Sequence, residues 1–218
     1  MDLRARDVWV AGRRGLPALA EIELALVPGC ALGVAGGEVR ARRSLLAALA
    51  GTLPIARGEI LLDGRPASED PLGWRSSVGL SLPRAPRASN FAVDSYLRAT
   101  GEIFGLSPRE AVHRASELLD LLALSSRARV PLIRLAAPES TRLELARVLV
   151  PDPEVILLDG AVPGFEGDIE AFRRILDFLL GAGKALLLAA EDAAPLHDLG
   201  VPVRLLAGAR LLPGDGVR

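Results

Sequence analysis

The sequence predicts an α/β fold with a mostly parallel sheet, an N-terminal β part of short strands and a helical insert. Three patterns indicate this fold. Short alternating strands with turn signals open the chain, a helical segment fills the middle, and apolar strands alternate with helices in the last third. Strands that are apolar throughout and separated by helices are typical of a parallel sheet covered on both faces.

The N-terminal elements follow from period-two alternation and turn signals. Residues 20–26 alternate apolar and polar side chains, and a Pro-Gly turn leads into the apolar strand 31–36. A helix over 43–51 comes next and ends at a glycine. Strand 58–62 then ends in an Asp-Gly dipeptide, which favours a hairpin.

The middle of the chain, about 84–134, begins irregularly and is then expected to form a helical insert. Its clearest helix opens with Ser107 as N-cap, Pro108 at the first helical position and Glu110 completing a capping box. Helical spacing predicts one apolar face on this helix, made of Val112, Ala115, Leu119 and Leu122.

The last third predicts the parallel sheet itself. A helix from residue 140 stops at Pro151 and leads to strand 154–159, which ends in an aspartate. A helix over 168–183, a strand over 184–192 and a hairpin around Gly208 complete the pattern. A chain of 218 residues fits one or two domains.

Composition excludes several classes of function. The 26 basic and 27 acidic residues leave a net charge of −1, which argues against a nucleic-acid-binding surface built on bulk charge. The single cysteine cannot form an intramolecular disulfide, and His113 and His197 are far apart, so no metal site is assigned. The first ten residues are charged and no apolar run spans a bilayer, so we expect a soluble cytoplasmic protein.

Four segments, in one collinear order, resemble the ATP-binding subunit of an ABC transporter over nearly the whole chain. They are residues 28–51, 57–66, 145–160 and 181–192, which are similar to the family's Walker A strand, loop and helix, the following hairpin, the signature helix with Walker B, and the segment before the switch histidine. The resemblance implies a P-loop NTPase-like ABC ATPase fold with an N-terminal antiparallel β part. It also implies a single nucleotide-binding domain over residues 1–218, with a helical subdomain at about 84–150 inserted in the α/β core.

The Walker A positions depart from the family's chemistry. Gly36 keeps the first glycine, whereas Val39 and Ala41 stand where the family has the other two. Arg42 takes the place of the lysine that reaches the β- and γ-phosphates, and Arg43 the place of the hydroxyl that holds Mg²⁺. Val39 conflicts most, because a β-branched residue resists the positive φ of a phosphate loop.

The Walker B and switch positions are altered as well. Asp159 is kept, but Gly160 replaces the glutamate that polarises the attacking water, and Glu191 replaces the switch histidine. The family's glutamine falls near Pro83 or Arg84, and Glu166 is a candidate for the aspartate after Walker B. For Asp159, capping a helix or binding loop N–H groups is the alternative to metal binding.

The signature motif is replaced completely. Leu-Ser-Gly-Gly becomes Leu135, Ala136, Ala137 and Pro138, so the serine hydroxyl is missing and proline removes an N–H group. Trp9 lies near the place where the family stacks adenine on an aromatic side chain, and a core position is the alternative.

These losses, beside intact strands, caps and turns, predict a catalytically degenerate ATP-binding subunit, a pseudo-ATPase with a structural or regulatory role in a transporter-like complex. Two alternatives remain open. One is a divergent but active ATPase in which Arg42, Ser44 and Asp159 work in a rearranged loop. The other is a soluble interaction module without a membrane partner.

The resemblance implies two partners, a transmembrane permease subunit and a second ATP-binding subunit, and a peripheral location on the inner face of the cell membrane. Phe91, Val93 and Tyr96 are the expected contact with a permease, with core packing as the alternative. No cofactor is assigned; MgATP, held weakly, is the ligand that the resemblance leaves open.

Overall fold

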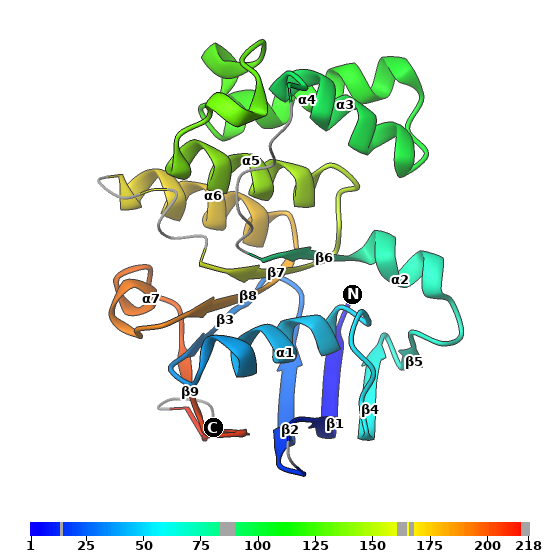
Figure 1. The fold of residues 1–218 in the computed structure, drawn as a ribbon, viewed down its shortest axis with the longest axis vertical. Coiled ribbons are helices and arrows are strands. Elements are labelled where there is room, and N and C mark those ends of the chain that lie inside the picture. The colour runs from blue at the N-terminus through cyan, green and yellow to red at the C-terminus, as the bar shows by residue number, and fades with distance from the viewer. Residues whose placement is uncertain (14, 83–89, 161–164, 166–167, 215–218) are drawn as a thin grey trace.

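The computed structural model describes residues 1–13, 15–82, 90–160, 165 and 168–214 of the chain. Its strands form two sheets, one of four strands in the order β2-β1-β4-β5 and one of six in the order β10-β9-β3-β8-β7-β6. Figure 1 shows the larger sheet between two layers, with α5 and α6 on one side and α1 on the other. The predicted α/β fold is confirmed.

The four-stranded sheet is antiparallel and starts the chain. It contains β1 (Leu3–Ala11), β2 (Pro17–Leu26), β4 (Arg57–Leu62) and the short β5 (Arg65–Pro66). Strand β1 is central and pairs with both β2 and β4. The Asp-Gly turn joins β4 to β5 as predicted, with both of its residues at positive φ.

The six-stranded sheet is parallel except for its last edge strand. Its parallel members are β9 (Val203–Ala207), β3 (Ala31–Ala35), β8 (Ala185–Ala190), β7 (Val155–Asp159) and β6 (Val78–Ser81). Strand β10 (Arg210–Leu211) pairs antiparallel with β9, so the predicted C-terminal hairpin is confirmed.

The helices divide between the core and the helical subdomain. In chain order they are α1 (Val39–Leu49), α2 (Pro71–Ser77), α3 (Val93–Ile103), α4 (Pro108–Leu121), the 3₁₀ turns η1 (Ser125–Arg127) and η2 (Leu132–Arg134), α5 (Ala137–Leu149), α6 (Ile169–Gly181) and α7 (Ala194–Asp198). In Figure 1, α3 and α4 lie on the far side of α5 from the sheet.

Alternation along the parallel strands produces two apolar clusters, one on each face of the sheet. Ile156 and Leu158 of β7 pack with α3 to α6, whereas Val155 and Leu157 pack with α1 and the antiparallel sheet. All four of these side chains are fully buried. This double burial explains why the strand is apolar at every position before its final aspartate.

Three expected helix features differ in detail. Helix α1 begins at Val39, four residues before the predicted start, and α5 begins at Ala137 instead of residue 140. The capping box of α4 is present as predicted. On the same helix Val112 is 50% exposed, so its assignment to the apolar face is wrong. The buried face instead carries Ala111, Ala115, Leu118, Leu119 and Leu122.

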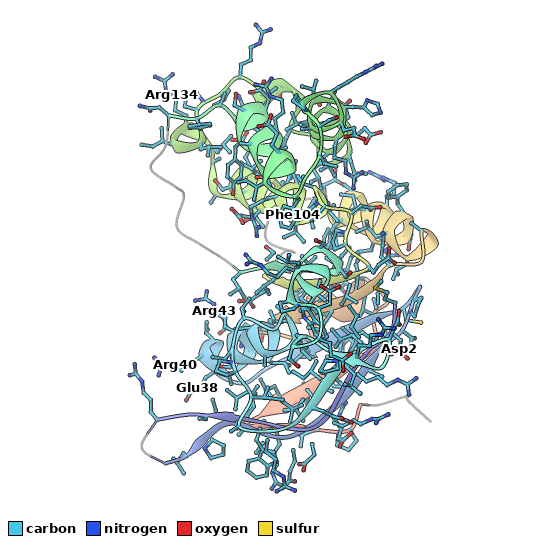
Figure 2. All side chains as sticks on the ribbon, turned by 90° about the vertical axis from the view of Figure 1, so that its right-hand side faces the viewer. Asp2, Glu38, Arg40, Arg43, Phe104 and Arg134 are labelled. Carbon is cyan, nitrogen blue, oxygen red and sulfur yellow. The ribbon has the colours of Figure 1, made fainter. Side chains whose placement is uncertain are left out.

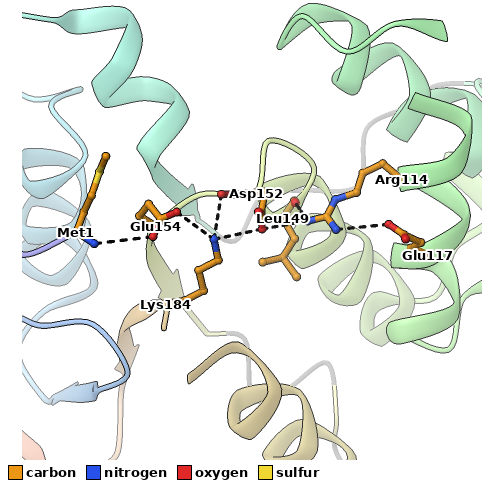
Figure 3. Close-up of polar contacts among 7 residues, drawn as sticks. All are labelled: Met1, Arg114, Glu117, Leu149, Asp152, Glu154 and Lys184. Carbon is orange, nitrogen blue, oxygen red and sulfur yellow. Dashed lines mark hydrogen bonds and ion pairs between the residues drawn. The ribbon is translucent and has the colours of Figure 1, made fainter. Parts of the chain in front are cut away.

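A network of charges joins the helical subdomain to the sheet at the amino ends of β7 and β8 (Figure 3). Arg114 of α4 donates to the carbonyl of Leu149 at 2.7 Å and lies 3.4 Å from a carboxylate oxygen of Asp152. The ammonium of Lys184 lies 3.3 Å from that same Asp152 oxygen and 3.3 Å from the carboxylate of Glu154. Lys184 is 7% exposed, so these contacts satisfy a buried charge.

Within the described part of the chain, the helices are all too short or too polar to span a membrane.

Candidate functional site

The carboxyl ends of three neighbouring parallel strands bring the predicted site positions together. Strand β3 leads into Gly36, β7 ends at Asp159, and β8 is followed by Glu191. The Gly36 N–H donates to the Glu191 carbonyl at 3.0 Å, and Gly160 N–H donates to the carbonyl of β8 residue Ala189 at 3.0 Å. This edge is where open α/β sheets bind ligands.

The loop between β3 and α1 is short, because the helix starts early. Only Gly36, Gly37 and Glu38 separate the two elements, and both glycines have positive φ, +79° and +65°. Val39 is the first helical residue, so the predicted steric conflict at Val39 does not arise. The chain reaches this conformation by replacing the later part of a phosphate-wrapping loop with helix.

The side chain of Arg42 folds back onto the loop between β3 and α1. Its side chain is buried, and its Nη1 donates to the carbonyls of Gly36 at 2.9 Å and Gly37 at 2.8 Å. Its backbone N–H donates to the Glu38 carbonyl at 3.1 Å, which is an ordinary helical bond. One guanidinium nitrogen of Arg42 is therefore engaged by the loop itself, whereas its buried Nε has no hydrogen-bond partner among the described residues.

Arg43 pairs with the aspartate at the end of β7. Its Nε lies 3.3 Å from Oδ2 of Asp159, and the Nε of Arg42 approaches Oδ1 to 4.0 Å. The Asp159 side chain is 6% exposed, whereas that of Arg43 is 44% exposed. Among the described residues, Asp159 thus pairs with Arg43 and lies near Arg42, and the choice between metal binding and the capping of N–H groups stays a prediction. Ser44, the shifted hydroxyl candidate, is half-buried on α1.

These residues do not fit a magnesium ion. Mg²⁺ requires oxygen ligands in near-ideal octahedral geometry, and arginine offers donors only. The position expected to carry a metal-binding hydroxyl holds the Arg43 guanidinium, which occupies the carboxylate that the ion would use. Among the described residues, no group of three or more His, Cys, Asp or Glu side chains is arranged to hold a metal.

The residues that replace the signature motif form the start of α5. Leu135 is buried, Ala136 is the N-cap, and Ala137 and Pro138 are exposed at the first helical positions. The carboxylate of Glu139 accepts the Ala136 N–H at 2.9 Å, and this hydrogen bond lowers the pKa of Glu139. A negative charge thus already occupies the positive end of the α5 dipole.

Arg127 neutralises part of this charge from η1, where its Nε donates to Glu139 at 2.7 Å. Neither Glu139 nor Arg127 was predicted from the sequence. A glutamate at the third helical position was a visible signal, but the usual Ser or Thr at the N-cap is missing here. In Figure 2 the exposed Arg134 of η2 lies on the same side of the molecule as Arg40 and Arg43 of α1.

The remaining predicted site positions offer few groups that could bind or react with a ligand. Gly160 has no side chain and a φ of +65°, and the Glu191 side chain is exposed. Pro83, Arg84 and Glu166 lie outside the described residues.

The aromatic candidates divide between surface and core. Trp9 belongs to neither apolar cluster; its Nε1 donates to Asp7 at 2.8 Å and Arg57 stacks 5.9 Å from the ring centre. Phe91 is 58% exposed, but Val93 is fully buried and Tyr96 packs against the core. Of the three predicted contact residues, only Phe91 presents a large apolar surface.

The chain matches the model of the ABC transporter family over residues 19–162. It is 31% identical over 170 residues to the Nod factor export ATP-binding protein I of Cupriavidus metallidurans, a match that covers 77% of this chain and 55% of that protein. It is 30% identical over 215 residues to the cobalt import ATP-binding protein CbiO of Rhodobacter capsulatus, covering 96% of this chain and 77% of CbiO.

Solved structures show the same fold. An ATP-binding subunit of an ABC transporter superposes with a TM-score of 0.85 at 16% identity, covering 99% of this chain and 90% of that one. The structure of cbiO1 from Clostridium perfringens, described as part of the ABC transporter complex cbiONQ, superposes with a TM-score of 0.81 at 20% identity, covering 97% and 87%. The family match, the similarity to CbiO over 96% of this chain and the fold together establish that this chain belongs to the ABC transporter family, as a nucleotide-binding domain.

Proposed function

We propose that this chain is a catalytically degenerate ATP-binding subunit that has a structural or regulatory role in a transporter-like complex. The observation that carries the proposal is the filled loop, in which Arg42 bonds the Gly36 and Gly37 carbonyls and Arg43 bonds Asp159. A phosphate loop works by presenting free N–H groups and a free cation to the ligand.

Drawing Arg42 out of the loop toward a phosphate would break its contacts with the loop. Two hydrogen bonds to carbonyl groups would be broken, each with a net contribution of about 0.5–1.5 kcal/mol and more where the donor is charged. The phosphate would itself pair with the guanidinium, so the cost lies in the Gly36 and Gly37 carbonyls, which lose their donor. Nucleotide binding through Arg42 has to overcome this cost.

A glycine stands at the position of the catalytic base for ATP hydrolysis. Gly160 stands directly after the aspartate of β7 and has no group that orients or deprotonates water. At α5 the Glu139 carboxylate lies where an incoming phosphate would need an uncompensated positive dipole. Asp159 and the start of α5 are therefore paired with groups of the chain itself, which supports a role in assembly over one in turnover.

Partners follow from the relatives. CbiO and the Nod factor protein are named as import and export ATP-binding proteins, and cbiO1 is described as part of a transporter complex. By that analogy, this chain assembles with a transmembrane permease subunit and with a second ATP-binding subunit, on the inner face of the membrane. An intact second subunit would supply whatever ATP turnover the complex retains.

A divergent but active ATPase is the rival function, and the names of the relatives favour it. In that case MgATP would enter the loop, displace Arg42 from the glycine carbonyls and use Asp159. Calorimetric titration of MgATP into the purified chain separates the two functions, with Arg42→Ala as the site variant and Arg109→Ala, an exposed arginine of α4, as the matched control.

The degenerate subunit gives no saturable heat with MgATP in the wild type or either variant. Micromolar binding that is kept in Arg109→Ala and lost in Arg42→Ala would overturn the proposed function. Such a result would make the arginine-bearing loop a working nucleotide site.

A further inference from the structure

We propose that Arg43 is a built-in replacement for the divalent cation at Asp159, so that this chain holds its loop together without metal and takes up no Mg²⁺ at that carboxylate. The inference rests on the proposed function and deepens it, because it assigns a positive role to one of the altered positions. It concerns the residues of this chain and does not depend on whether a partner subunit is active.

The geometry places a positive group where the carboxylate needs one. Asp159 ends β7 with its side chain 6% exposed, and a carboxylate this deeply buried requires a cationic or hydrogen-bonding partner. Arg43 provides one from α1, 116 residues away in sequence, through an Nε hydrogen bond of 3.3 Å. The helix directs the side chain at the strand end, so the pair also joins α1 to β7.

The charge of Asp159 is neutralised without an ion. Arg42 and Arg43 contribute two positive charges against the one negative charge of Asp159, which leaves about +1 at the edge of the sheet. A divalent ion added here would meet two guanidinium groups at close range. It would gain one carboxylate that already has a partner, so its binding is opposed by both repulsion and competition.

The Arg43 side chain also remains partly exposed to solvent. Its 44% exposure lets the guanidinium remain hydrated while it neutralises a buried charge, which lowers the desolvation cost of the pair. A buried lysine would lose this advantage, because it is a compact and strongly hydrated cation. The wide, planar guanidinium therefore suits a site that spans the boundary between core and solvent.

The test uses the full chain in four forms: wild type, Arg43→Ser, Asp159→Asn and the double variant. In metal-free buffer, Arg43→Ser is expected to lower Tm by about 2–4 °C, as expected for a change of about 1 kcal/mol in a chain of this length. The double variant should be no less stable than Arg43→Ser, because the amide removes the buried charge that lost its partner. A double variant that loses the sum of the two single-variant losses would contradict the pairing.

A second experiment on the same four proteins counts bound Mn²⁺ by electron paramagnetic resonance. Mn²⁺ serves as a spectroscopic substitute for Mg²⁺, because the two ions prefer similar oxygen ligands. The wild type should bind no more Mn²⁺ than Asp159→Asn, whereas Arg43→Ser should gain a millimolar site that the double variant lacks. Metal binding to the wild type that Asp159→Asn abolishes would overturn the inference. Equal binding by all four forms would also overturn it, because Arg43 would then not be what excludes the ion.

These results are distinct from those that test the proposed function. Wild-type ATP binding together with metal exclusion would refute the degenerate subunit and leave the role of Arg43 intact. Metal binding at Asp159 without any nucleotide binding would refute the role of Arg43 and leave the degenerate subunit intact.

Discussion

Replacing Lys184 by methionine is expected to loosen the junction between the helical subdomain and the sheet. Lys184, the only lysine of the chain, begins the segment that becomes β8, and its ammonium contacts the turn before β7. Methionine keeps most of the unbranched apolar stem but removes the charge. The variant therefore isolates the electrostatic contribution of the network from the packing of the side chain.

The size of the effect follows from the exposure of the partners. A hydrogen bond to a charged group contributes about 1.5–3 kcal/mol when both groups are buried. The Asp152 and Glu154 side chains are 69% and 40% exposed, so water screens their contacts and each contributes no more than about 1 kcal/mol. We expect Lys184→Met to lower the free energy of unfolding by about 1–2 kcal/mol in total.

Differential scanning calorimetry measures this change, since each kcal/mol shifts Tm by about 2–4 °C in a chain of this length. Arg109→Met, an exposed position on α4, is the control for a lost surface charge and should stay within about 0.5 kcal/mol of the wild type. A Lys184→Met variant at least as stable as the wild type would refute the reasoning. The buried ammonium would then be tolerated by the fold and would not stabilise it.

Three other perturbations have distinct expected outcomes. Leu118→Ala should cost about 2–5 kcal/mol in urea titration because its side chain is buried in the helical subdomain, whereas exposed Val112→Ala should stay within about 0.5 kcal/mol; equal losses would contradict the assigned face. The hydrogen bond from Ala136 lowers the pKa of Glu139, so its stabilisation is present above the unfolded-state pKa of about 4.3 and is lost as pH falls through the folded value. Acid unfolding of Glu139→Gln should depend less on pH in that window, and an unchanged profile would refute this. Arg42→Ala should lower stability by about 1–3 kcal/mol in calorimetry, because two loop carbonyls lose their donor; no loss would show that water replaces the guanidinium without cost.

The sheet was predictable from sequence because burial constrains its strands on both faces. Residues 155–158 and 185–189 are buried at every position, and only apolar side chains suit such a strand. The start of α4 was predictable for a different reason. Its capping box is a local pattern of three residues, Ser107, Pro108 and Glu110, whose hydrogen bonds do not depend on distant parts of the chain.

Helix starts without polar caps were harder to predict. Helix α3 begins after Ala92 and α5 after Ala136, and neither N-cap side chain can accept a hydrogen bond. The early start of α1 at Val39 was missed because the expected phosphate loop placed non-helical backbone there. On α4 the contact is made by Ala111 instead of Val112, a shift of one residue that spacing alone does not resolve.

The site was predictable as a set of positions but not as a set of contacts. The order of the motifs placed Gly36, Asp159 and Glu191 at one edge of the sheet, and the strand order brings them there. The inward turn of Arg42 and the pairing of Arg43 with Asp159 depend on the packing of α1 against β7. No local pattern encodes the contact between Arg43 and Asp159, which are 116 residues apart in sequence.

The central claim is that the chemistry of the loop, and not the fold, separates this chain from a working nucleotide site. The most direct test is calorimetric titration of MgATP into the wild type and into a variant that restores the family's loop through Val39→Gly, Ala41→Gly, Arg42→Lys and Arg43→Ser. The account predicts saturable MgATP binding by the restored variant and none by the wild type. Binding of equal strength by both proteins would contradict it.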